Sequence, residues 1–394
     1  MPQDTAHGLR CFIIADDLTG SCDAAVHFAA RGVSSKVAID WRQPPLEPAP
    51  VVAVNTDSRT IAEEEARLRV SDALHAARGR YQFTLKKIDS ALRGNVAVEV
   101  HAAAEAMASE VIFVAPALPV LNRRVRQGAV ILPSGEQIQL AHALAPLPIV
   151  TVATHDLVNT ESLLARLHHA AAQGVRYVCF DAESDADLDA VVALGLACEQ
   201  RVLWVGSAGL AAAIARASVG TQVAQVADLP AGEGPVLFGV GSDHEATLEQ
   251  VKRLKQDGLL YECSLDALSA PLSVAALGEA VHKHHNVLLH IPRSGIKPTQ
   301  MAAFAAAAPF RAFRGLVLTG GDTAAAFLHA AGAHTLEVAG EVMPGIPISV
   351  ARGGTVDGAR VITKSGAFGE ANAFAHCVEY LHGPVSVAGE RSCR

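Results

Sequence analysis

Residues 87–95, Lys-Ile-Asp-Ser-Ala-Leu-Arg-Gly-Asn, gather an ammonium, a carboxylate, a hydroxyl, a guanidinium and an amide in one short stretch. An apolar run at 81–85, typical of a strand, precedes it, and a helix-like run at 96–107 follows it. Open α/β sheets bind ligands at the carboxyl ends of their strands, where this mixture of groups would lie. The simpler explanation is a solvated loop whose Asp89 or Ser90 caps the following helix.

Two further polar turns follow apparent strands in the first half of the chain, at 16–17 and 57–59. Because the carboxyl ends of parallel strands meet at one edge of a sheet, we expect the three turns to cluster. Arg59, Lys87 and Arg93 would suit a carboxylate or phosphate, and the Asp and Ser side chains can bind hydroxyl groups. The sequence therefore predicts a site for a small hydroxylated anion.

A basic turn at 122–128 comes later in the same half. We interpret it as an exposed hairpin and leave open a role for Asn122 or Arg123 beside the substrate.

The second half carries glycine-bearing turns at 239–242, 319–323 and 364–369, each before a helix-like run. Glycines permit tight turns and let backbone N–H groups face an anion at a helix N-terminus, so these turns favour a nucleotide. Ordinary helix starts are the alternative explanation. Neither standard motif is complete, because His244 stands where a dinucleotide fingerprint needs its third glycine and Thr363 where a P-loop needs one.

The elements that position these turns alternate between strand-like and helix-like runs. This alternation predicts an α/β fold of two domains, each with a largely parallel sheet flanked by helices. A segment rich in Pro and Gly separates the two periodic regions, so we place a substrate-binding domain at 1–228, a linker at 229–235 and a nucleotide-binding domain at 236–394. We expect the active site in the interdomain cleft. The strand-like runs before the linker are 11–15, 35–39, 51–55, 82–88, 111–115, 149–152, 177–181 and 201–205.

Composition narrows the class of partner. The chain has 394 residues, half of them apolar, and a formal charge of −8 without basic clusters, which argues against nucleic acid or a membrane as partner. Its seven cysteines show no metal-like spacing, and no uncharged apolar run reaches the ~20 residues that span a bilayer. We therefore expect a cytoplasmic enzyme acting on a small molecule, without protein metal ligands, and leave a homo-oligomer open.

Taken together, these segments resemble the four-carbon acid sugar kinase family. The resemblance implies an N-terminal domain that binds a sugar acid and a C-terminal domain that binds ATP. It also implies Mg²⁺-dependent transfer of the γ-phosphoryl group to the 4-hydroxyl of threonate, erythronate or 3-oxo-tetronate. The matching motifs are Ala15-Asp-Asp-Leu-Thr-Gly20 with Asp23, Thr56-Asp-Ser-Arg59, Lys87-Ile-Asp-Ser with Leu92-Arg-Gly-Asn95, Gly206-Ser-Ala-Gly-Leu210, Thr319-Gly-Gly-Asp-Thr323, Pro344-Gly-Ile-Pro347 and Lys364-Ser-Gly-Ala-Phe-Gly369.

The resemblance also assigns residues to each ligand. We expect Arg59 or Lys87 to hold the substrate carboxylate and Asp16 or Asp89 to act as catalytic base. Ala91 stands where the family commonly has Thr, and 119–122 also departs from its pattern, which leaves the particular acid open. The predicted substrate-binding residues are Asp16, Asp17, Arg59, Lys87, Ile88, Asp89, Ser90 and Arg93. The predicted ATP-binding residues are Ser242, Gly320, Gly321, Asp322, Thr323 and Gly366.

Two other classes of function stay open. An NAD-dependent dehydrogenase of a small hydroxy acid would bind its cofactor at 239–242, with Glu262 about where a ribose-binding acid is expected. A non-catalytic sugar-acid-binding protein would use the first domain alone.

Overall fold

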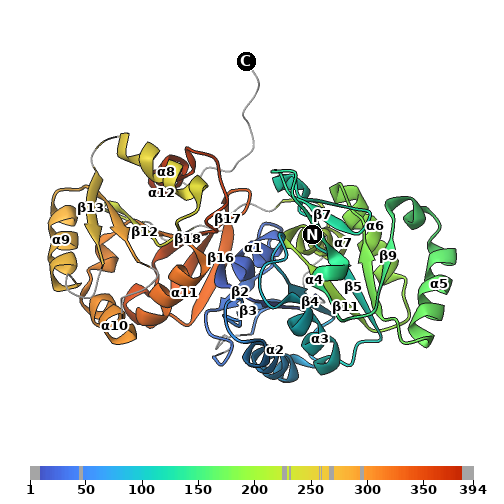
Figure 1. The fold of residues 1–394 in the computed structure, drawn as a ribbon. Helices are drawn as coiled ribbons and strands as arrows, with labels where there is room; N and C mark the ends of the chain where they lie inside the picture. The colour runs from blue at the N-terminus through green and yellow to red at the C-terminus, as the bar shows by residue number, and fades with distance from the viewer. Residues whose placement is uncertain are drawn as a thin grey trace, which may run out of the picture. The chain divides into compact units, whose positions relative to one another are not determined.

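The computed structural model describes residues 9–43, 48–223, 229, 232–256, 258, 260–265, 270–292 and 297–383. The chain forms two compact units, shown in Figure 1. The first comprises Met1–Val33 and Glu47–Gln222, and the second comprises Ser34–Leu46 and Val223–Arg394. Both have a sheet flanked by helices, which confirms the α/β prediction. Pro230 and Ala231 of the predicted linker lie outside the described residues.

The sheet of the first unit is parallel, in the order β3-β1-β4-β11-β5-β10-β9. Three of its strands, β1, β3 and β5, are short and largely apolar runs whose residues are all buried, as expected for a covered parallel sheet. In register, Ala15 of β1 pairs with Asn55 of β3 and Lys87 of β4, so three polar turns begin at one edge. The strands are β1 (Cys11–Ala15), β3 (Val51–Asn55), β4 (Phe83–Lys87), β5 (Val111–Ala115), β9 (Ile149–Val152), β10 (Tyr177–Phe180) and β11 (Val202–Gly206).

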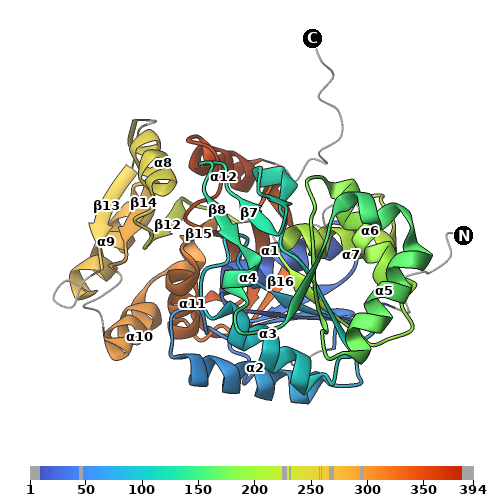
Figure 2. The ribbon, with the colours of Figure 1, turned by 45° about the vertical axis from the view of Figure 1, so that its right-hand side comes forward.

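Helices cover both faces of this sheet. On one face α1 packs against α7 and α7 against α6, and Figure 2 shows α2 and α3 side by side on the other. A small antiparallel sheet, β6-β7-β8, contains the hairpin predicted at 122–128. The helices are α1 (Leu18–Ala29), α2 (Glu63–Ala77), α3 (Val96–Ala106), α4 (Leu140–Ala143), α5 (Thr160–Ala172), α6 (Asp185–Leu196) and α7 (Ala208–Val219), and the small strands are β6 (Arg124–Arg126), β7 (Ala129–Ile131) and β8 (Gln137–Gln139).

The sheet of the second unit has the order β13-β14-β12-β15-β18-β17-β16-β2. It is parallel from β13 to β18 and antiparallel from there to β2. The strand expected at 35–39 exists as β2 (Ser35–Ala38), but it pairs with β16 of this second unit, a crossing that local sequence does not reveal. The other strands are β12 (Val236–Val240), β13 (Leu260–Ser264), β14 (Asn286–His290), β15 (Gly315–Thr319), β16 (Thr335–Met343), β17 (Ile346–Arg352) and β18 (Arg360–Lys364).

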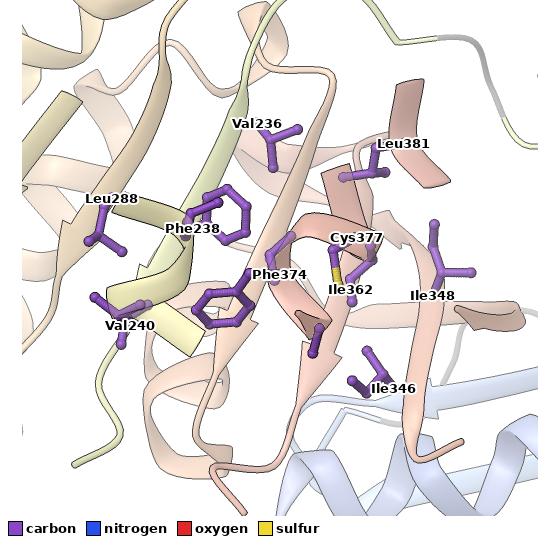
Figure 3. Close-up of a cluster of buried hydrophobic side chains, with 14 residues drawn as sticks. Val236, Phe238, Val240, Leu288, Ile346, Ile348, Ile362, Phe374, Cys377 and Leu381 are labelled. Atoms are coloured by element: carbon purple, nitrogen blue, oxygen red, sulfur yellow. The ribbon is translucent and has the colours of Figure 1, made fainter. Parts of the chain in front are cut away.

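Figure 3 shows the core on one face of this sheet. Val236, Phe238 and Val240 alternate along β12 and point to the same side, as the two-residue period of a strand requires. The ring of Phe238 packs against Phe374 of α12 with centroids 5.1 Å apart. Burying each such side chain contributes roughly 1.5–3 kcal/mol. The helices are α8 (Glu245–Gln256) and α12 (Ala373–His382), which pack together, and α9 (Ala270–His282), α10 (Pro298–Ala307) and α11 (Gly321–Ala330).

Candidate functional site

The turn after β1 is built around Asp17, the N-cap of α1. Its carboxylate accepts hydrogen bonds from Gly20 N and Thr19 Oγ1, both at 2.8 Å, which satisfies a free N–H of the first helical turn. A Cβ at position 20 would lie 2.5 Å from Asp17 Oδ1, so only glycine leaves room for this cap. The glycine of the Asp-Asp-Leu-Thr-Gly motif therefore has a local structural reason.

Arg59 joins the first two polar turns. Its guanidinium donates to both carboxylate oxygens of Asp16, at 2.6 and 2.9 Å, and to Asp17 Oδ2 at 2.9 Å. Burial would lower the pKa of Arg59, but Asp17 and Asp16 together raise it above its usual range. Burial would likewise raise the pKa of Asp16, but Arg59, with Lys86 and Lys87, lowers it. Both groups are therefore charged and held in one geometry.

The third turn has its own ion pair. Arg93 donates two hydrogen bonds to the carboxylate of Asp89, at 2.9 and 2.7 Å, and Asp89 lies 3.9 Å from Arg59. Burial would raise the pKa of Asp89, but the hydrogen bonds from Arg93 and the charge of Arg59 hold it well below its usual range. Arg123, left open by the sequence, donates to Ser90 Oγ and so belongs with this turn.

Lys86 and Lys87 are adjacent in β4 and point to opposite faces of the sheet. Lys86 forms a 2.6 Å ion pair with Glu99 of α3 and has no exposed side-chain surface. Lys87 Nζ lies near Gly20 on the α1 side, 3.2 Å from the place of a Cβ there, and donates to Ile88 O. Among the described residues its ammonium has no carboxylate within 4.0 Å. Lys87 is therefore a buried cation with N–H groups left to bind a ligand.

The structure thus brings most of the predicted substrate-binding residues together in the first unit. Ile88 is buried, and its carbonyl oxygen accepts a hydrogen bond from Lys87 while its N–H donates to Gly206 O. We call this group the charged centre; it consists of Asp16, Asp17, Arg59, Lys87, Asp89, Ser90, Arg93 and Arg123.

The glycine turns of the second unit meet at the ends of three neighbouring parallel strands, β12, β15 and β18. Gly320 N donates to Lys364 O at 2.9 Å, which ties two of the turns together. A Cβ at position 366 would lie 2.1 Å from Ser242 Oγ, and one at 241 would lie 2.1 Å from Thr323 Oγ1. An added Cβ at either position would force the neighbouring side chain or turn to shift. Gly321 and Asp322 begin α11 at the same place.

Lys364 holds the last of these turns from inside. Its ammonium donates to Thr247 Oγ1 and to three carbonyl oxygens of its own turn, those of Ser365, Gly366 and Phe368, at 3.0–3.4 Å. The side chain is fully buried, so these bonds replace water. We call the group of Ser242, Gly320, Thr323, Lys364 and Gly366 the glycine centre.

The described residues offer no set of side-chain ligands for a resident metal ion. Within the described ranges no group of three or more His, Cys, Asp or Glu side chains could hold one. Mg²⁺ keeps several waters and is commonly bound by phosphates with one or two protein carboxylates. The exposed Asp322, at the start of α11, is a carboxylate that could serve it.

The turn at 206–209 proves to be a packing feature. Cβ atoms at Gly206 and Gly209 would lie 2.5 and 2.4 Å from the carbonyl oxygens of Ala115 and Ala117. Ser207 Oγ also donates to Ala117 O. These two glycines therefore let the turn pack closely against the backbone of residues 115–117.

No helix in the described part of the chain is long and apolar enough to cross a membrane.

Comparison with known families matches both halves of the chain. Residues 11–157 and 135–214 match a sugar-binding N-terminal domain, and residues 237–374 match a nucleotide-binding C-terminal domain.

Curated relatives match over almost their whole length. A D-threonate kinase of Cupriavidus necator is 34% identical, over 92% of this chain and 96% of its own. A D-threonate kinase of Bordetella bronchiseptica is 32% identical, over 91% and 94%. A 3-oxo-tetronate kinase of Cupriavidus necator is 29% identical, over 96% and 98%.

Solved structures share the fold. A Salmonella typhimurium protein described as a putative tRNA synthase superposes with a TM-score of 0.74 at 19% identity, over 93% of this chain and 98% of its own. A Haemophilus influenzae protein from a domain family of unknown function superposes with a TM-score of 0.66 at 20% identity, over the same shares.

Proposed function

This chain belongs to the four-carbon acid sugar kinase family, and from that membership we propose that it transfers the γ-phosphoryl group of ATP to the terminal hydroxyl of a four-carbon acid sugar. The observation that carries the proposal is the pairing of a charged centre in one unit with a glycine centre in the other. A charged centre suits a small hydroxylated acid, and backbone N–H groups at a helix start suit a polyphosphate.

The contacts of the charged centre favour Lys87 over Arg59 as the anchor of the substrate carboxylate. Arg59 already has two aspartates as partners, whereas the ammonium of Lys87 is buried and spends one donor on Ile88 O. A buried cation without a counter-ion is costly, so an incoming carboxylate would be bound strongly. Arg59 then keeps Asp16 and Asp17 in place.

The glycine centre supports a site for ATP. Its turns lie at the start of α8 and α11 and before α12, and the missing Cβ atoms of its glycines let these turns approach one another closely. When bound, Mg²⁺ neutralises charge on the phosphate oxygens, with Asp322 as its protein carboxylate. Ser242, Gly320 and Thr323 would hold the triphosphate, and Gly366 would keep the neighbouring turn close. Phosphoryl transfer requires the two bound ligands to meet and water to be kept out.

We propose D-threonate as the acid. The Cupriavidus necator and Bordetella bronchiseptica relatives that are 34% and 32% identical are both D-threonate kinases, although Ala91 and 119–122 depart from the family pattern.

The test is a coupled assay of ADP release with Mg-ATP and each of D-threonate, L-threonate, D-erythronate, L-erythronate and the 3-oxo-tetronates. Lys87→Ala and Asp322→Ala are the site variants, and Lys252→Ala, at an exposed lysine of α8, is the control. We expect release with D-threonate, lost in both site variants and kept in the control. Absence of ADP release with every acid would overturn the proposal, and would favour a non-catalytic binding protein if D-threonate still raised the Tm.

The dehydrogenase alternative has little support at Glu262. Its carboxylate lies 2.7 Å from Lys255 and 3.6 Å from His290, in an exposed ion pair. A rise in Tm with NAD but not with Mg-ATP would favour the dehydrogenase over the kinase.

A further inference from the structure

The two carboxylates expected to act as catalytic base each form an ion pair with an arginine. Asp16 accepts two hydrogen bonds from Arg59, and Asp89 accepts two from Arg93. A carboxylate held in a bidentate pair has a lowered pKa and has its lone pairs engaged, so it is a poor proton acceptor. Asp17 is occupied too, because it caps α1 and accepts from Arg59.

Asp23 differs from all three. It lies on α1, nearly one turn beyond Gly20, the residue beside which Lys87 Nζ is placed. Its exposure is 7%, close to the values of 3% for Asp16 and 6% for Asp89. In the part of the chain that the structure describes, its carboxylate accepts no hydrogen bond and has no cation within 4.0 Å. A buried carboxylate without partners is destabilising, which is a mark of functional sites.

The charges around Asp23 come from three elements. Lys87 of β4 and Arg123 of the loop after β5 act on it with positive charge, and Asp17 at the start of α1 acts with negative charge. Burial raises the pKa of Asp23 to about 6; Asp17 adds to this rise, and Lys87 and Arg123 oppose it. A carboxylate that titrates near neutral pH is ionised in the working enzyme and still basic enough to accept a proton.

We propose that Asp23 is the general base of the phosphoryl transfer, an assignment that rests on the proposed function. The terminal O–H bond of the acid sugar breaks, and its proton passes to a carboxylate oxygen of Asp23. That hydroxyl oxygen forms a bond to the γ-phosphorus as the bond between γ-phosphorus and the β–γ bridging oxygen breaks. ADP leaves with the electron pair of that bond, and Asp23 returns its proton to water.

Binding of the acid sugar should raise the pKa of Asp23 and so make it a stronger base. An anionic carboxylate beside Lys87 removes part of the positive charge that lowers the pKa of Asp23. The acid limb of kcat, which reports the substrate complex, should therefore lie at higher pH than the acid limb of kcat/KM, which reports the free enzyme at about pH 6.

The experiment compares pH profiles of ADP release for the full-length wild type, Asp23→Asn and Asp23→Glu. Asp23→Asn keeps the shape and should lower kcat by about 10²–10⁴ and remove the acid limb, with a nearly unchanged KM for the acid sugar. Asp23→Glu restores a carboxylate and should recover part of kcat together with the limb. A residue with only a structural role would not move the limb.

Asp181→Asn is the matched control. Asp181 is also buried in the first unit, where it accepts from the backbone N–H groups of Gln127 and Gly128, outside the charged centre. Its variant should keep the acid limb, whatever its effect on stability.

A readout without turnover completes the test. Isotope-labelled aspartate should show one carboxyl group titrating near pH 6 in the resting wild type and missing in Asp23→Asn. Absence of that group, or Asp23→Asn within threefold of wild type with its acid limb intact, overturns the assignment of Asp23 while leaving the kinase standing. Absence of ADP release from the wild type with any acid overturns the kinase, and the base with it.

Discussion

The charged centre and the glycine centre are built in opposite ways. In the charged centre, side chains make the surface that would face a ligand, and ion pairs such as Arg59 with Asp16 hold them. In the glycine centre the surface is backbone, brought close by missing side chains, and its one cation, Lys364, is turned inward. A small hydroxy acid is recognised by individual side chains that pair with its carboxylate and hydroxyl groups. A polyphosphate is recognised by several backbone N–H groups that donate to its oxygens.

The two centres should therefore respond differently to mutation. Removing a charged side chain from the charged centre leaves other charges buried without partners, so stability and activity should fall together. Adding a methyl group to a glycine of the glycine centre should disturb nucleotide binding and leave recognition of the acid intact.

The largest effect should come from Arg59→Ala. It leaves the carboxylates of Asp16 and Asp17 buried without their cation, at a cost of about 3–5 kcal/mol in the free energy of unfolding, measured in urea. Arg67→Ala, at an exposed bidentate pair with Glu64, should leave the urea midpoint nearly unchanged. Equal losses in the two variants would show that the burial of Asp16 and Asp17 does not set the cost of removing their cation.

The next effect has the opposite sign. Since the pKa of Asp23 rises from 3.8 to about 6 on folding, its contribution to stability is full below pH 3.8 and is lost as pH rises through 6. At pH 8 the ionised group costs at most about 3 kcal/mol, so Asp23→Asn should raise the Tm there, and the gain should vanish near pH 4. A Tm of Asp23→Asn below that of wild type at pH 8 would show that the carboxylate stabilises the charged centre.

Lys364→Met tests the cation of the glycine centre. The variant keeps the apolar stem but leaves three turn carbonyls without their donor, at a cost of about 1–3 kcal/mol in the free energy of unfolding. The KM for ATP should rise because the turn is no longer held. Lys283→Met, at an exposed lysine after α9, is the control and should change neither quantity. An unchanged KM for ATP would mean that the turn does not contact the nucleotide.

The smallest change is Gly366→Ala. The new Cβ would meet Ser242 Oγ at 2.1 Å, so the Ser242 hydroxyl must rotate away or the two turns must move apart. We expect the KM for ATP to rise about tenfold, equal to about 1.4 kcal/mol. The KM for the acid sugar should stay the same. Gly278→Ala is the control, because it lies on α9 with open space at its Cβ and should be neutral or slightly stabilising. A parallel rise in both KM values would show that the centres are not independent.

Much of this arrangement could be predicted from the sequence, for a physical reason. Apolar runs that end in Asp16 or Lys87 mark parallel strands, and the carboxyl ends of parallel strands share an edge, so the polar turns had to meet. Partners across the fold could not be predicted. The sequence does not say that Lys86 faces Glu99 while Lys87 faces Gly20, because that depends on which face α3 covers.

The role of Asp23 and the pairing of β2 could not be predicted, for the same reason. Asp23 stands in the resembling motif, but only the structure shows that Arg59 and Arg93 bind other carboxylates and leave that of Asp23 without a partner among the described residues. The run that forms β2 has strand character, yet its partner lies in the other half of the chain, as the register of Ser35 with Val338 shows.

The position of β2 also determines which fragments of the protein can fold on their own. A fragment that begins after Gln222 would contain the nucleotide-binding domain except for Ser35–Ala38, and would leave β16 with a bare row of N–H and C=O groups. Such an edge recruits strands from other molecules, so the truncated protein should aggregate or dimerise. Adding 34–46 as a separate peptide, or grafting it by circular permutation, should restore a monodisperse fragment.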